Sequence, residues 1–142
     1  MKGRVEFKVK GDLPPKKDGA KSMWAKRAEI PRLIALRLAA LKAMAGRPPF
    51  RSSIELELEL HCSVLPGRRI GDLDTFITGV CDGLMAAVPQ FEKDQRWEAK
   101  ELADIHPSKI VAIEDDSAIV LITARKMAET GQPWYRVSLL GE

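Results

Sequence analysis

Apolar and polar residues alternate along two segments of the chain, residues 4–10 and 54–62. In the second segment the apolar side carries Ile54, Leu56, Leu58, Leu60 and Cys62, and the polar side carries Glu55, Glu57, Glu59 and His61. A period of two is the spacing of a β-strand with one buried face. Both segments are therefore predicted to be strands. Shorter apolar runs predict three more, at 109–113, 118–126 and 134–139.

Apolar residues follow helical spacing in two other segments, about 29–45 and about 74–87. Pro31 suits the first turn of the earlier helix, and Gly46 suits its C-terminal end. A shorter helix is expected around 95–103, within a connection of residues 86–108 bounded by prolines. Strands and helices alternate, so we predict an α/β (mixed α+β) fold with about four to five strands and two main helices. The whole chain, 1–142, is expected to form one domain.

The composition is that of an ordinary globular protein, 45% hydrophobic and 30% charged, with a net charge of +3. Basic residues gather in the first third of the chain, which permits an acidic partner. The two cysteines, Cys62 and Cys81, lack metal-binding spacing and lie in apolar patterns, so we expect buried thiols rather than a zinc site. No apolar run is long enough for a membrane span, and the N-terminal residues are too charged for a signal peptide. These features predict a soluble cytoplasmic protein.

Asp72 and Asp74 lie at the start of the second predicted helix, and two explanations fit them. An aspartate is a common N-cap, and negative charge is favourable in the first helical turn. If Asp72 precedes the helix and Asp74 begins it, both carboxylates can instead reach one cation. Asp82 lies on the same helix face as Asp74 and Thr78, and the pattern favours a solvated helix residue there.

A second acidic pair, Asp115 and Asp116, falls in a predicted turn, where acidic residues are common. Together with Asp72 and Asp74, Asp116 offers the few carboxylate oxygens that Mg²⁺ prefers, with other positions left to water and phosphate. Such a site polarises a phosphodiester and activates water.

The order GDLDTFITGVCDGL, EDDSAIV and a closing hairpin resembles the RusA-type Holliday-junction resolvases. The resemblance covers most of the chain except about residues 86–108. It implies a small mixed α/β homodimer that cleaves four-way junctions or other branched DNA with Mg²⁺, or with Mn²⁺. The catalytic and metal-binding residues that it implies are Asp72, Asp74 and Asp116, with Asp115 in support. The implied DNA-binding residues are Lys16, Lys17, Arg68 and Arg69.

The sequence departs from that family at Thr78, where the family usually has a lysine, and at Thr75, where asparagine is usual. A hydroxyl cannot supply the charge of a lysine, so another cation has to substitute for it or activity is weak or lost. Lys93, Arg96 and Lys109 are candidates for that cation. Two alternatives to an active nuclease stay open: a catalytically inactive nucleic-acid-binding protein with this fold, and a protein with no nucleic-acid role.

Overall fold

The computed structural model describes residues 2–17, 19, 21–63 and 72–142. Its elements follow the order expected of a mixed α+β protein. The strands are β1 (Gly3–Lys10), β2 (Ile54–Cys62), β3 (Ile119–Ala128) and β4 (Trp134–Gly141), and the α-helices are α1 (Ile30–Met44) and α2 (Leu73–Leu84). Three short 3-10 helices are η1 (Gln95–Glu98), η2 (Lys100–Ile105) and η3 (Asp116–Ala118). None of the helices in these described ranges has the length and apolar character needed to cross a membrane.

The four strands form one mixed sheet in the order β1-β4-β2-β3. β4 is antiparallel to both of its neighbours, whereas β3 is parallel to β2. The sheet therefore confirms the predicted mixed α+β class, with four strands. β3 forms one of its two edges.

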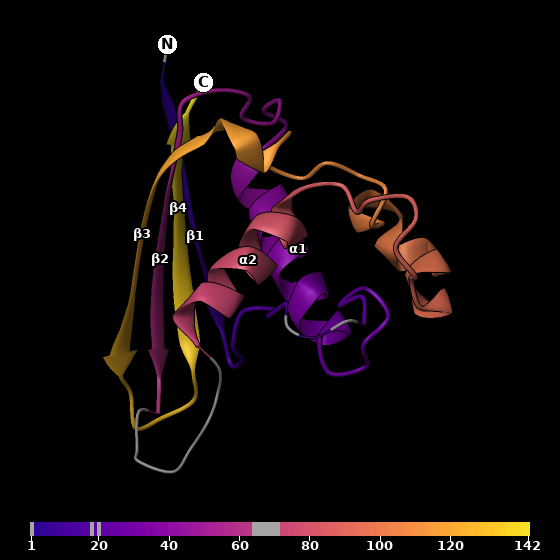
Figure 1. The fold of residues 1–142 in the computed structure, drawn as a ribbon, viewed down its shortest axis with the longest axis horizontal. Helices are drawn as coiled ribbons and strands as arrows, with labels where there is room; N and C mark the ends of the chain where they lie inside the picture. The colour runs from indigo at the N-terminus through magenta and orange to yellow at the C-terminus, as the bar shows by residue number, and fades with distance from the viewer. Residues whose placement is uncertain (1, 18, 20, 64–71) are drawn as a thin grey trace.

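Both α-helices lie on the same face of the sheet (Figure 1). The alternating residues of β2 explain this layering, because its apolar side is buried beneath the helices and its glutamates lie on the other face. On that open face, Arg136 of β4 forms ion pairs with Glu6, Glu57 and Glu59. Hydrogen bonds from His61 and Arg136 lower the pKa of Glu59 to about 2.

The loop after β1 lies directly against α2. A Cβ atom at Gly79 would stand 2.0 Å from the carbonyl oxygen of Pro15, far inside van der Waals contact. Lys17 N–H donates to the carbonyl of Thr75 at 3.2 Å. Only glycine at position 79 allows this approach, which fixes the basic loop beside the helix.

Residues 86–108 pack beyond α1, on the side away from the sheet (Figure 1). They contribute to a second apolar cluster in which Trp24 and Trp97 meet with ring centroids 5.7 Å apart. The indole N–H of Trp97 donates to the carbonyl of Trp24 at 3.0 Å. This connection is therefore held to the start of α1 by packing and by a buried hydrogen bond.

Arg37 of α1 is fully buried and joins several segments. Its guanidinium donates five hydrogen bonds of 2.7 to 2.9 Å, all to backbone carbonyls. The acceptors are the carbonyls of Gly83, Met85, Ile105, His106 and Lys109. Burial lowers the pKa of Arg37 to about 10, so the side chain stays charged at neutral pH.

The second predicted helix is present as α2, but it ends at Leu84 rather than at about 87. Arg37 donates to the carbonyls of Gly83 and Met85 at this end. A predicted strand in the same region was wrong. Residues 109–113 were predicted as a strand but form only one bridge, between Phe50 and Ile113. The N–H groups of residues 111–113 converge on the carbonyl of Leu84 instead of extending a ladder.

We expect Arg37→Met to lower the free energy of unfolding by about 3 to 5 kcal/mol, because it leaves several buried carbonyls without a donor. Lys42→Met, at an exposed position of the same helix, should change it by less than about 0.5 kcal/mol. Urea denaturation of both variants measures the difference. Equal stability of the two variants would contradict this role of Arg37.

Candidate functional site

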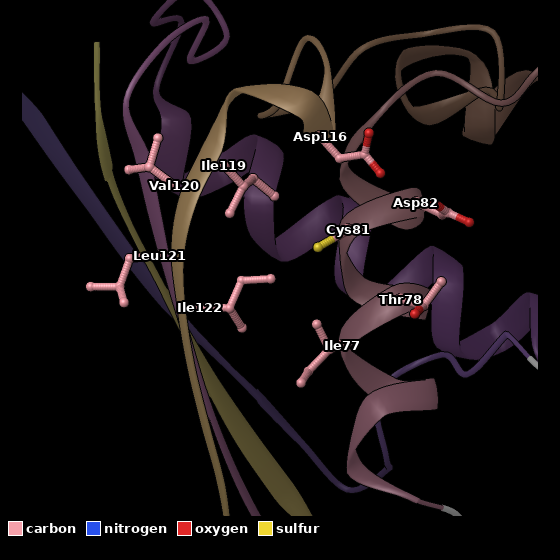
Figure 2. Close-up of a pocket in the computed structure, with 9 residues that line it drawn as sticks. All are labelled: Ile77, Thr78, Cys81, Asp82, Asp116, Ile119, Val120, Leu121 and Ile122. Atoms are coloured by element: carbon pink, nitrogen blue, oxygen red, sulfur yellow. The ribbon is translucent and has the colours of Figure 1, made fainter.

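A groove of about 400 Å³ separates α2 from the edge strand β3. Figure 2 shows Ile77, Cys81, Ile119 and Ile122 facing each other across it. Asp82 and Asp116 lie toward the end of the groove at which α2 ends and η3 begins. The groove is thus apolar along its length and acidic at one end.

Asp82 and Asp116 come from segments more than thirty residues apart. The Asp116 N–H lies 3.1 Å from the sulfur of Met85, which follows α2 directly, so η3 is held at the end of the helix that carries Asp82. Partial desolvation of its carboxylate and the negative charges of Asp82 and Asp115 raise the pKa of Asp116. A raised carboxylate pKa beside a second carboxylate indicates a place where added positive charge is favourable.

Asp115 has a structural role beside this pair. Its Oδ1 accepts the backbone N–H of Ser117 at 2.9 Å and so caps η3. Hydrogen bonds from Ser117 lower the pKa of Asp115. The capping bond fixes the short helix that presents Asp116.

Lys17, in the loop after β1, lines a second hollow of about 200 Å³ together with Asp82 and Asp116. Its Nζ lies 3.1 Å from Oδ2 of Asp82 and 5.2 Å from the centre of the Phe91 ring. The close contact between Pro15 and Gly79 and the backbone bond to Thr75 hold this loop in place. A cation therefore stands beside α2, supplied by a loop distant in sequence.

Asp72 and Asp74 lie at the opposite end of α2. Asp72 is the N-cap residue, but its side chain accepts no capping hydrogen bond, and Asp74 is exposed in the first turn. Eight residues of helix, about 12 Å, separate Asp74 from Asp82. In the part of the chain that the structure describes, no three acidic, histidine or cysteine residues lie close enough to hold a metal ion. The structure thus brings Asp116 to Asp82 and does not bring it to Asp72 and Asp74 within one chain.

The two threonines that differ from the family pattern bond to the helix backbone. Thr75 Oγ1 donates to the carbonyl of Asp72 at 2.7 Å, and Thr78 Oγ1 donates to the carbonyl of Asp74 at 3.0 Å. Neither side chain supplies a charge. Of the cations proposed to replace the usual lysine, Lys93 donates to the carbonyls of Pro89 and Phe91.

The other predicted DNA-binding residues divide into two groups. Lys16 lies beside Lys17 in the loop, and its backbone N–H donates to Oε1 of the buried Glu29 at 2.9 Å. Arg68 and Arg69 lie outside the described residues. Lys16 and Lys17 therefore belong to a loop anchored at both α1 and α2.

Sequence reasoning missed the part played by Asp82. The helical pattern favoured a solvated residue, which was wrong, because the Asp82 side chain is 20% exposed and paired with Lys17. The sequence placed Lys17 among the expected DNA-binding residues but did not predict its ion pair with Asp82. The spacing Asp74-Thr78-Asp82 placed Asp82 on the correct helix face, but only the fold shows which loop covers that face.

The pair Asp82 and Asp116 suits a hard cation such as Mg²⁺. This ion is commonly held by one or two carboxylates, and its remaining positions are filled by water and phosphate oxygens. The buried thiol of Cys81, whose pKa burial raises to about 12, contributes no soft ligand. The donors at the acidic end of the groove are thus oxygen atoms.

No protein-family model matches this chain, and a search of curated proteins finds no significant match.

We expect Asp82→Asn to lower the pKa of Asp116 toward its ordinary range, because the substitution removes a negative charge that raises it. The carboxyl carbon shift of Asp116, followed by NMR over a pH series, measures this. Asp104→Asn, at an exposed position in η2, is the matched control and should leave the pKa unchanged. An unaltered pKa in Asp82→Asn would contradict the coupling.

Proposed function

We propose that this protein is a metal-dependent endonuclease that hydrolyses phosphodiesters in branched DNA such as four-way junctions. The observation that carries the proposal is the pair of carboxylates, Asp82 and Asp116, which share a hollow beside the end of α2 with Lys17. The resemblance of GDLDTFITGVCDGL and EDDSAIV to RusA-type resolvases supports the choice of substrate.

In this proposal, Asp82 and Asp116 hold Mg²⁺ or Mn²⁺. The bound ion would polarise the phosphodiester and lower the pKa of a water molecule. Asp72 and Asp74 stay the ligands predicted by the resemblance, and Asp115 keeps η3 in place. Lys17 binds the negatively charged phosphate of the DNA, with Lys16 in the same loop.

Lys17 is proposed as the replacement for the lysine that the family has at the position of Thr78. Its Nζ already lies 3.1 Å from Asp82, so its ammonium neutralises charge where a phosphate would approach. A divalent cation on Asp82 would compete with this ion pair and release Lys17 toward the substrate. The positive charge would then come from Lys17, in the loop after β1, rather than from a lysine at the position of Thr78 in α2.

A second candidate function is junction binding without cleavage. The Thr78 hydroxyl, bonded to the carbonyl of Asp74, favours it, because no cation occupies that helix position. Binding to a labelled junction with no product in Mg²⁺ or Mn²⁺ would decide for this function.

The test of the proposed function is cleavage of a labelled four-way junction in the presence of Mg²⁺. We expect Asp82→Asn and Asp116→Asn to reduce the rate at least about 100-fold, the effect of removing a key charge from a catalytic site. Lys17→Met should weaken binding and reduce its salt dependence. Asp104→Asn should cleave as the wild type does.

Cleavage that continues in Asp116→Asn, or in the presence of a chelator, would exclude the proposed site. Asp74→Asn separates the two ligand sets, because its rate falls only if the predicted ligand Asp74 takes part in the reaction.

A further inference from the structure

A third hollow, of about 350 Å³, lies between the loop after β1 and residues 90–92 of the connection that follows α2. The buried side chains of Met23 and Trp24 form part of its apolar lining. Phe91 also lines it and is 37% exposed, so its ring is accessible to a ligand. A partly aromatic, partly polar hollow of this volume is typical of a site for a small organic group. We call it the Phe91 hollow.

The turn that carries Phe91 is fixed by hydrogen bonds on both sides of the ring. Lys93 Nζ donates to the carbonyls of Pro89 and Phe91 at 3.3 and 2.9 Å. The N–H of Asp94 donates to the carbonyl of Trp24 at 3.1 Å, which ties the turn to the lining of the hollow. Because the turn is already ordered, a planar group that stacks on Phe91 has little further ordering of the protein to offset.

Cations and hydrogen-bonding side chains surround this ring. Lys17 Nζ lies 5.2 Å from the centre of the Phe91 ring, and Lys21 lines the same hollow from the loop. The amide of Gln90 can both donate and accept, and the Ser22 hydroxyl, whose oxygen accepts a backbone N–H at 3.2 Å, keeps its proton to donate. An aromatic face beside lysines is the combination that binds single-stranded nucleic acid, with bases stacked on the ring and phosphates at the cations.

The Phe91 hollow adjoins the acidic pair of the candidate site. Lys17 and Asp82 line it, and both also line the second hollow, to which Asp116 contributes. A DNA strand with one nucleotide on Phe91 would therefore pass directly beside the carboxylates proposed to hold the metal ion.

We infer that the Phe91 hollow binds one unpaired nucleotide of a DNA strand, with its base stacked on Phe91 and its phosphate beside Lys17 and Lys21. Taking a base out of a duplex costs least where the base is already unpaired, so the hollow favours bulges and branch points over intact duplex. The choice of DNA as the ligand rests on the proposed function, but binding does not require cleavage. Phe91 belongs to the connection 86–108, which the resemblance to resolvases does not cover.

The charges of the hollow give the inference a consequence with a definite sign. Among the described residues that line it, Lys17 and Lys21 are balanced by Asp82 and Glu92. Asp82→Asn removes one negative charge and frees Lys17 from its ion pair, so it should strengthen DNA binding without metal, although the same change should abolish cleavage. Metal-free binding that is unchanged or weaker in Asp82→Asn would overturn the placement of the phosphate beside Lys17.

Two labelled duplexes test the stacking contact by fluorescence anisotropy in the presence of a chelator. One carries a single bulged adenosine, and the other carries an abasic residue at the same place. Phe91→Leu keeps an apolar side chain but has no ring, so it should bind the adenosine bulge about 5- to 150-fold more weakly than the wild type does. It should bind the abasic bulge as the wild type does, because no base is present to stack.

Two further variants separate stacking from a general loss of structure. Phe91→Trp keeps an aromatic face and should retain the preference for the adenosine bulge. Ile110→Ala is the matched control, since Ile110 is an exposed apolar residue outside the hollow, and it should bind both duplexes as the wild type does. A Phe91→Leu variant that is weakened equally on both duplexes, or on neither, would overturn the inference.

The same duplexes distinguish this inference from the proposed function. A wild type that prefers the adenosine bulge through Phe91 but never cleaves DNA in Mg²⁺ would uphold the nucleotide site and refute the nuclease. A wild type that cleaves junctions but binds both bulges equally would refute the nucleotide site alone. Free deoxyadenosine monophosphate should compete only weakly, since it lacks the flanking strand. Competition at the same concentration as the bulged duplex would overturn the assignment to a DNA strand.

Discussion

The buried guanidinium of Arg37 joins the end of α2 to the end of η2 and the segment that follows it. Its five hydrogen bonds reach the carbonyls of Gly83 and Met85 on one side and of Ile105, His106 and Lys109 on the other. No carboxylate is among these partners. The partial negative charge at the C-terminal end of α2 and the face of Trp24, 5.2 Å away, favour the cation instead. A buried charge of this kind is stable only while all of its partners stay in place.

The acidic end of the groove depends on this arrangement. With the end of α2 fixed by Arg37, the carbonyl of Leu84 accepts the N–H groups of residues 111–113. That anchor determines where the chain enters η3, and hence how Asp116 meets Asp82. The loop that carries Lys17 is fixed separately, by its contact with Gly79. Structural contacts from three distant segments therefore create one small cluster of charges.

The strands and helices could be predicted because the spacing of their apolar residues follows the period of each element. The strict alternation of β2 was confirmed, and so was the helix at α1. The apolar stripe predicted for α1 was wrong, because Leu38 and Leu41 are exposed and Leu36 and Ala40 are buried. The cluster of charges could not be predicted from such patterns. In the sequence Arg37 is one more cation in a basic region, and residues 109–113 have the apolar character of a strand. The roles of Arg37 and of residues 109–113 depend on hydrogen bonds between segments about seventy residues apart. A local sequence pattern cannot predict such bonds.

NMR with Mn²⁺ tests directly whether Asp82 and Asp116 hold a divalent cation, as proposed. This paramagnetic ion broadens the signals of nearby nuclei, whether or not the protein cleaves DNA. We expect saturable broadening that is strongest at residues 82 and 116 and is reversed by excess Mg²⁺. Broadening centred elsewhere, or broadening that Mg²⁺ does not reverse, would contradict it.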